Sequence, residues 1–187
     1  MTSWWIGADP GGRWTGLALT TARGQYVRGL CITRTTHEPT RLGLGADYLA
    51  QVCDAILELQ IWAGERTPGL PLVAVEDIDR PNPHVRITDP SDIIRAAMVQ
   101  AAIRRDHPDA VIIALGKNGS HDPGLYPPQL RPIRSPGADP AGFSTEERPH
   151  IRSAFDIAKA GPGADRVRTR AAAIPRPQLP FKSRKRG

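Results

Sequence analysis

Two short apolar runs in this sequence each end at a single carboxylate, and they constrain the fold more than any other feature. Residues 4–8 lead into Asp9, and residues 70–75 lead into Glu76. The second run is continuous and contains β-branched residues, which favours a strand buried on both faces of a sheet. If the two strands are parallel neighbours, Asp9 and Glu76 project from the same end of that sheet.

The remaining patterns predict the other elements. Residues 4–8, 14–20 and 26–34 are strand-like and are separated by glycine-containing turns, and connections this short predict antiparallel hairpins. Helical spacing of apolar residues predicts three helices, and two later apolar runs predict two strands. In chain order these elements are a helix over 42–64, a strand over 70–76, a helix over 93–105, a strand over 110–115 and a helix over 146–160.

This order, three strands followed by helices alternating with strands, is the layout of the ribonuclease H-like fold. We therefore predict an α/β protein with a ribonuclease H-like mixed β-sheet, its first three strands antiparallel, flanked by helices. Residues 117–145 hold six prolines and four glycines, which exclude a continuous helix or a central strand. We predict one domain over 1–161 with an insertion at 117–145, followed by a basic, flexible tail over 162–187.

Charge and composition restrict the class of partner. The formal charge is +6, and residues 162–187 contain eight Lys or Arg and one acid, which favours a polyanionic partner such as nucleic acid. Cys31 and Cys53 lie in apolar surroundings and predict reduced core thiols. We find no signal-peptide pattern and no apolar run of about 18 residues, so we expect a cytoplasmic protein that does not contact a membrane.

A third acid, Asp156, lies on the last predicted helix, which can bring it close to Asp9 and Glu76 if it crosses that end of the sheet. Clustered carboxylates repel one another and need a cation or a proton. Hard oxygen ligands favour Mg²⁺ or Mn²⁺ over zinc. Two such ions about 4 Å apart would activate a water and stabilise the leaving oxygen of a phosphodiester.

Each part of this site has a plainer interpretation. Asp9 and the Pro10-Gly11-Gly12 segment after it also suit an ordinary hairpin turn. On the functional interpretation, the glycines at 11 and 12, and Gly16 on the facing strand, leave space for a phosphate backbone near Asp9. Asp156 also suits the solvent-facing side of an amphipathic helix.

These motifs resemble those of one family. Residues 6–11, followed by Thr15 and Gly16, resemble the first motif of RuvC-type Holliday-junction resolvases. Residues 73–76 look like the second motif, and residues 150–158 are similar to the acidic C-terminal helix of the family. The match spans residues 4–161 in order.

The resemblance implies a homodimeric, Mg²⁺-dependent endonuclease that nicks two strands of a four-way DNA junction and needs no organic cofactor. Asp9, Glu76 and Asp156 carry over as catalytic metal ligands. Many members have an acid or a histidine where this chain has Ser153, so either Ser153 or His150 is the candidate for a fourth ligand. The candidate DNA contacts are Gly11, Gly12, Lys117, Arg166, Arg168, Arg170, Lys182, Arg184, Lys185 and Arg186. A compact enzyme of this kind suits a phage or a mobile element.

Other functions fit parts of the same pattern. The fold and metals also suit a nuclease that acts on RNA or an RNA–DNA hybrid. Sugar-kinase and actin-like ATPases open with a similar acid-glycine hairpin, but they need a second domain for which 187 residues leave little room. A non-catalytic junction-binding protein, with Ser153 marking a lost ligand, is the non-enzymatic alternative, although Asp9 and Glu76 are both retained.

Overall fold

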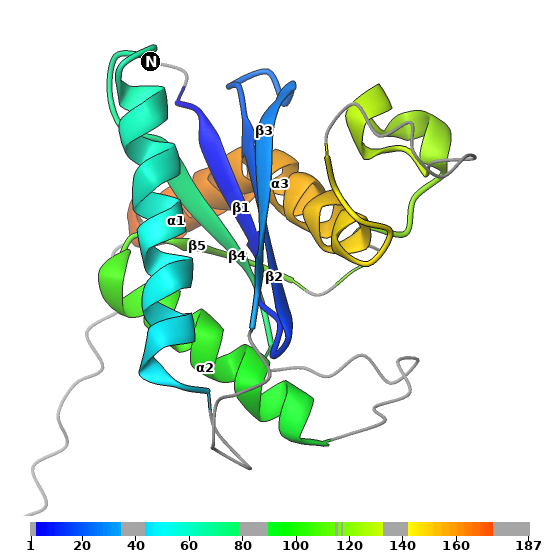
Figure 1. The fold of residues 1–187 in the computed structure, drawn as a ribbon. Helices are drawn as coiled ribbons and strands as arrows, with labels where there is room; N and C mark the ends of the chain where they lie inside the picture. Colours follow the sequence, from blue (N-terminus) through cyan, green and yellow to red (C-terminus); the bar gives the residue numbers. More distant parts are fainter. Residues whose placement is uncertain are drawn as a thin grey trace, which may run out of the picture.

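The computed structural model describes residues 3–34, 44–78, 90–114, 116, 118–132 and 142–173. Five strands and three α-helices follow one another along the chain, with two short 3₁₀ turns before the last helix (Figure 1). In order they are β1 (Trp5–Asp9), β2 (Trp14–Thr20), β3 (Tyr26–Thr33), α1 (Ala46–Gly64), β4 (Leu72–Glu76), α2 (Pro90–Asp106), β5 (Val111–Ile113), η1 (Pro123–Leu125), η2 (Pro128–Leu130) and α3 (Glu147–Ala173).

The strands form one mixed sheet in the order β3-β2-β1-β4-β5. β1 pairs antiparallel with β2, and β2 pairs antiparallel with β3. β4 lies parallel to β1 on one side and to β5 on the other, with Ala8 opposite Val75. The fold prediction is confirmed, and Asp9 and Glu76 follow directly after these two paired residues.

The helices cover both faces of the sheet. α1 and α2 lie over one face, and α3 crosses the other (Figure 1). Alternate residues of β1 accordingly enter different cores, since neighbouring side chains of a strand point to opposite faces. Ile6 packs with Tyr48 and Val52 of α1, whereas Trp5 packs with Ile157 of α3.

Two glycines bring α3 unusually close to the sheet. A Cβ atom on Gly7 would lie 1.9 Å from the Ala154 carbonyl oxygen, and one on Gly16 would lie 2.2 Å from that of His150. Both contacts are with helix backbone, which has no rotamer to move out of the way. The small residues of β1 and β2 therefore fix the distance between α3 and the carboxyl end of β1.

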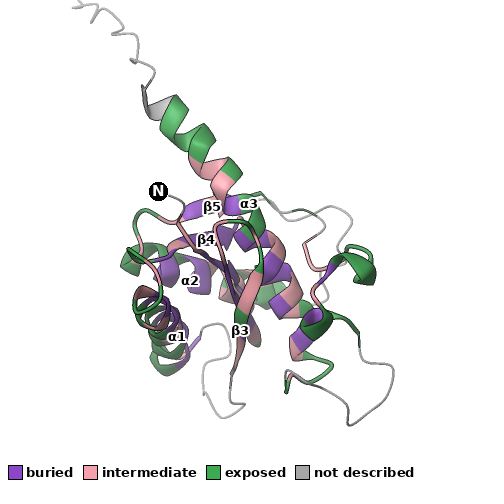
Figure 2. Cartoon of the chain, turned by 90° about the horizontal axis from the view of Figure 1, so that it is seen from above, coloured by how far each residue is buried: buried purple, intermediate pink, exposed green. Residues whose placement is uncertain are grey.

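The last helix extends beyond its predicted end at residue 160. α3 continues through Pro162 to Ala173, although a proline inside a helix loses one backbone hydrogen bond. Gly161 packs against the Trp5 ring, and Arg168 Nη1 donates to the Asp109 carbonyl oxygen at 2.7 Å, so tertiary contacts support the helix past the proline. Figure 2 shows this end of α3 as an exposed helix that extends away from the sheet.

The described part of the proline-rich insertion packs against α3. Residues 118–132 contain the two 3₁₀ turns, and Tyr126 and Leu130 are buried beside Ile151 and Phe155. Both cysteines are free thiols, with Cys53 buried in the α1 core. None of the helices in the described ranges has the length and apolar character needed to cross a membrane.

Candidate functional site

Asp9 lies at the entrance to a turn that α1 holds in place. The Tyr48 hydroxyl donates to the Gly11 carbonyl oxygen at 3.2 Å and lies 2.8 Å from the Thr15 hydroxyl oxygen. Thr15 in turn donates to the same Gly11 carbonyl at 3.3 Å. The turn is therefore anchored to the core, which holds the Asp9 backbone at the end of β1.

The glycines of this turn allow close packing, because a side chain at either position would meet protein atoms. A Cβ atom on Gly11 would lie 2.1 Å from the Trp14 carbonyl oxygen, and one on Gly12 would lie 2.7 Å from Cβ of Arg95. Gly16 lies under the backbone of α3. A role of these glycines in giving a phosphate backbone access to Asp9 stays a prediction.

Glu76 lies beside Asp9 and is held in its neutral form. Only 7% of the surface of Glu76 is exposed. Burial first, and then the negative charge of Asp9 and a hydrogen bond between the two side chains, raise the pKa of Glu76 from 4.5 to about 8. Asp9 and Glu76 are the neighbouring carboxyl groups that the sequence predicts at the ends of two parallel strands, and their negative charges would repel each other.

Asn118 is a third member of this group. Its Nδ2 donates to Glu76 Oε1 at 2.8 Å, a contact that acts against the raised pKa by favouring the charged carboxylate. Asn118 comes from the proline-rich insertion. The sequence analysis missed it because a single asparagine in an aperiodic segment carries no signal of its own.

His150, rather than Asp156, contacts Asp9 from α3. The His150 Nδ1 atom lies 2.9 Å from Asp9 Oδ2, and its ring stacks on that of Trp14 with centroids 5.6 Å apart. The helix backbone at His150 is the part that packs on Gly16, so the side chain starts close to the end of β1. Of the two candidates for a fourth ligand, the structure brings His150 to the acid pair.

Asp156 is engaged with the insertion. Its Oδ2 accepts hydrogen bonds from the Gly119 backbone N–H at 2.9 Å and from the Tyr126 hydroxyl at 2.7 Å. Neither Asp9 nor Glu76 is among its hydrogen-bond or ion-pair partners in the described part of the chain. Ser153 is buried, and its backbone lies close to Gly119. Asp156 thus helps to hold the segment that carries Asn118.

The predicted DNA contacts lie in several places. Arg166 and Arg170 are exposed near the end of α3, whereas Arg168 also pairs with Asp165 at 2.9 Å. Lys117 and the basic residues at positions 182, 184, 185 and 186 lie outside the described residues.

The donor set fits a hard divalent cation. Two adjacent carboxylates that repel each other, one of them strongly buried, become more stable when a cation neutralises them. The oxygens of Asp9 and Glu76 are suitable ligands for Mg²⁺ or Mn²⁺, whereas the imidazole of His150 suits softer transition metals and lies here at hydrogen-bond distance from Asp9. Across the described ranges, however, no three acidic, histidine or cysteine side chains lie together as a ready-made metal site.

The buried Glu76 carboxyl predicts a pH-dependent loss of stability in EDTA. Between the ordinary pKa of 4.5 and the folded value of about 8, the folded protein keeps a proton that the unfolded chain releases. The free energy of unfolding therefore falls as the pH rises through this window. Glu76→Gln should remove this loss and stabilise the protein at pH 8 by on the order of 2 kcal/mol.

Urea denaturation at pH 5 and pH 8 measures this effect. Glu58→Gln is the matched control, because Glu58 is an exposed carboxyl on α1. A wild-type pH dependence that persists unchanged in Glu76→Gln would show that Glu76 is not the titrating group.

The comparisons with known proteins agree with the fold. No protein-family model and no curated protein sequence matches the chain. The structure is similar to that of T. thermophilus RuvC in complex with a Holliday junction substrate, with a TM-score of 0.54 and 17% identity, over 88% of this chain and 96% of that one. A second Thermus thermophilus RuvC structure matches with a TM-score of 0.51 and 17% identity, over 89% and 97% of the two chains. The chain thus has the ribonuclease H-like fold of RuvC.

Proposed function

We propose that the protein is a Mg²⁺-dependent endonuclease of the RuvC type that cleaves phosphodiester bonds in branched DNA, with Mn²⁺ able to replace Mg²⁺. The observation that carries this proposal is the Asp9–Glu76 pair at the ends of two adjacent parallel strands. A buried carboxyl beside a second acid binds either a proton or a cation, and a metal-dependent phosphodiesterase site uses the cation.

The residues of the chain have separate roles in this proposal. Asp9 and Glu76 hold the cation, which supplies a Lewis acid and a bound water of lowered pKa. Asn118 fixes the orientation of the Glu76 carboxylate, and His150 fixes that of Asp9 or shares in ligation. Asp156 remains a proposed further ligand through Oδ1, because Oδ2 already accepts two hydrogen bonds.

Branched DNA is the proposed substrate because the fold is similar to that of a protein solved with a Holliday junction. A four-way junction presents two equivalent strands, so paired nicks require two active sites. A homodimer with two-fold symmetry provides them. The exposed Arg166 and Arg170 and the basic residues after position 173 supply positive charge for the arms of the junction.

A substrate panel tests the proposal. A labelled four-way junction, a linear duplex of the same sequence and an RNA–DNA hybrid are incubated with the protein in Mg²⁺. We expect nicks in the junction and little cleavage of the other two. Preferential cleavage of the hybrid would mean that the protein acts on RNA–DNA hybrids instead of branched DNA. If none of the three substrates is cleaved, the nuclease proposal is refuted.

Asn118→Ala is expected to slow junction cleavage about tenfold at pH 7. Loss of the Nδ2 donor removes the contact that opposes the raised pKa of Glu76, so a smaller share of the protein carries the charged carboxylate. The rate should therefore recover as the pH is raised, unlike a loss caused by misfolding. A rate–pH profile with the same midpoint as the wild type would contradict this role for Asn118.

A further inference from the structure

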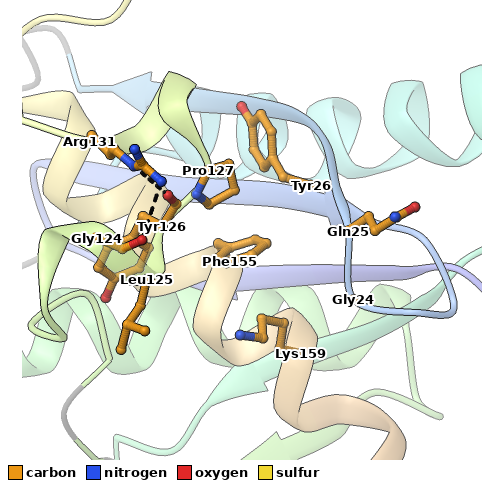
Figure 3. A pocket seen from close by; sticks show the side chains of 10 residues that line it. All are labelled: Gly24, Gln25, Tyr26, Gly124, Leu125, Tyr126, Pro127, Arg131, Phe155 and Lys159. Atoms are coloured by element: carbon orange, nitrogen blue, oxygen red, sulfur yellow. Dashed lines mark hydrogen bonds between the residues drawn. The ribbon is translucent and has the colours of Figure 1, made fainter.

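A pocket of about 540 Å³ lies beside α3, and neither Asp9 nor Glu76 is among its lining residues (Figure 3). It is formed where the β2–β3 turn, the ordered insertion and α3 meet. Its walls are Gly24, Gln25, Tyr26, Gly124, Leu125, Tyr126, Pro127, Arg131, Phe155 and Lys159. None of these residues belongs to the site described above, except that the Tyr126 hydroxyl reaches Asp156 behind the wall.

One part of the lining is aromatic. The Tyr26 ring meets Phe155 edge to face, with centroids 6.0 Å apart, and Tyr126 lies 6.3 Å from the same Phe155 ring. Phe155 and Tyr126 are buried, whereas Tyr26 is half-buried and faces the pocket. Aromatic faces at a recess provide stacking surfaces that accept any nucleic-acid base.

The rim is cationic. Lys159 is exposed, with its ammonium 5.2 Å from the centre of the Phe155 ring, and it has no carboxylate partner among the described residues. Arg131 donates from Nε to the Tyr126 carbonyl and from Nη2 to the Gly124 carbonyl, and these hydrogen bonds hold its guanidinium at the pocket (Figure 3). Within the described ranges, no carboxylate forms an ion pair with it. Two cations that have no acidic partner among the described residues, next to aromatic rings, suit a ligand with a phosphate and a planar ring.

Tyr26 adds a neutral donor to this environment. Burial raises the pKa of Tyr26 to about 12, against the opposing positive charges of Arg148 and Arg28. The phenol therefore keeps its proton at neutral pH. Tyr26 therefore offers a ring for stacking and a hydroxyl that can donate a hydrogen bond to a base edge or to a phosphate oxygen.

The position along α3 relates the pocket to the carboxylate pair. His150 contacts Asp9, and Lys159 follows nine residues later on the same helix, which corresponds to about 13 Å of helical rise. That distance equals about four steps of a stacked strand at 3.4 Å per nucleotide. Nine residues also turn the helix by about two and a half turns, so His150 and Lys159 lie on opposite sides of α3, and a strand at Asp9 and Glu76 would have to pass round the helix to reach the pocket.

We propose that this pocket binds one unpaired nucleotide of the DNA substrate, with its base against Tyr26 and its phosphate facing Lys159. Stacking on the Tyr26 ring requires a base whose face is free, so the pocket favours strands that are frayed or single. This inference rests on the proposed function, which supplies the DNA strand, and it adds a subsite for strand distortion.

Binding of a fluorescein-labelled single-stranded oligothymidine, measured by fluorescence anisotropy in EDTA, tests the pocket without any cleavage. Lys159→Glu should weaken binding about tenfold, and Lys159→Ala should lower the slope of log K against log salt by about 0.7, the value for one lost phosphate contact. Arg66→Glu is the matched control, since Arg66 is an exposed cation at the end of α1 and changes the net charge equally. Binding of a blunt duplex should respond equally to Lys159→Glu and Arg66→Glu.

Tyr26→Leu tests the stacking surface, with an expected loss of fivefold or more in single-strand affinity. The melting temperature of Tyr26→Leu shows whether this variant folds. If it does not fold, the variants at the exposed Lys159 still test the pocket. Equal effects of Lys159→Glu and Arg66→Glu on the single strand would overturn the pocket. If Lys159→Glu weakens single-strand binding but the wild-type protein never nicks a junction, the proposed function is refuted and the binding pocket is supported.

Discussion

Replacing Asp9 by asparagine is expected to lower the rate of Mg²⁺-dependent junction cleavage by about a thousandfold or more. The substitution keeps the size of the side chain and an oxygen that can still contact His150, but it removes the negative charge that the cation requires. It also removes the charge that helps to raise the pKa of Glu76, so the folded protein should not be destabilised. A gel assay of a labelled junction measures the rate, and circular dichroism confirms the fold.

Asp54→Asn provides the comparison for Asp9→Asn. Asp54 is an exposed carboxyl of α1, so the variant makes the same chemical change away from the site and should cleave at the wild-type rate. Cleavage by Asp9→Asn within a few-fold of the wild type would mean that Asp9 is only a turn residue.

The second large effect is on stability. Gly7→Ala is expected to unfold the protein or to lower its free energy of unfolding by more than about 4 kcal/mol. The new methyl group would lie 1.9 Å from the Ala154 carbonyl oxygen and 2.5 Å from the Ala158 backbone nitrogen. Either α3 must move away from the sheet, or β1 must bend, and both changes also displace His150 from Asp9. Urea denaturation followed by circular dichroism measures the loss.

Gly163→Ala makes the same substitution where the added methyl group meets no atom within 4 Å beyond its chain neighbours and the backbone of its own helix. Because alanine favours a helix over glycine, this variant should be as stable as the wild type or more stable by up to about 1 kcal/mol. Equal denaturation midpoints for Gly7→Ala and Gly163→Ala would contradict the close packing of α3 on β1.

The sequence was sufficient to predict the sheet and the neighbouring positions of Asp9 and Glu76. Apolar runs that end at Asp9 and Glu76 predict parallel strands with adjacent ends, and the pairing of Ala8 with Val75 confirms this. The alternating pattern of residues 14–20 and the short turns likewise predict the hairpins that the structure contains. These features depend on local periodicity and turn chemistry, which a sequence records directly.

The contacts made by α3 depend on tertiary position, which the sequence does not record. Helical periodicity places His150, Ser153 and Asp156 on neighbouring parts of the helix surface, but it does not give the height at which α3 crosses β1. Six residues separate His150 from Asp156, about 9 Å of rise, so the helix brings His150 to Asp9 and Asp156 to the insertion. The height is set by the contacts of Gly7 and Gly16 with the helix backbone.

Two further features could not be predicted from the sequence for the same reason. Asn118 reaches Glu76 because Gly119, with a positive φ of 74°, turns the insertion back towards α3. Pro162 ends a helix in most local contexts, yet contacts of Gly161 and Arg168 with the rest of the fold carry α3 past it. In both cases distant parts of the chain override the local preference.

The most direct test of the central claim maps nicks on a four-way junction labelled separately on each of its four strands, with the wild-type protein in Mg²⁺ and in EDTA. The Asp9–Glu76 site predicts paired nicks at symmetric positions on two strands in Mg²⁺ and none in EDTA. Tight binding of the junction without nicks in either Mg²⁺ or Mn²⁺ would contradict the account and would identify the protein as a non-catalytic junction-binding protein.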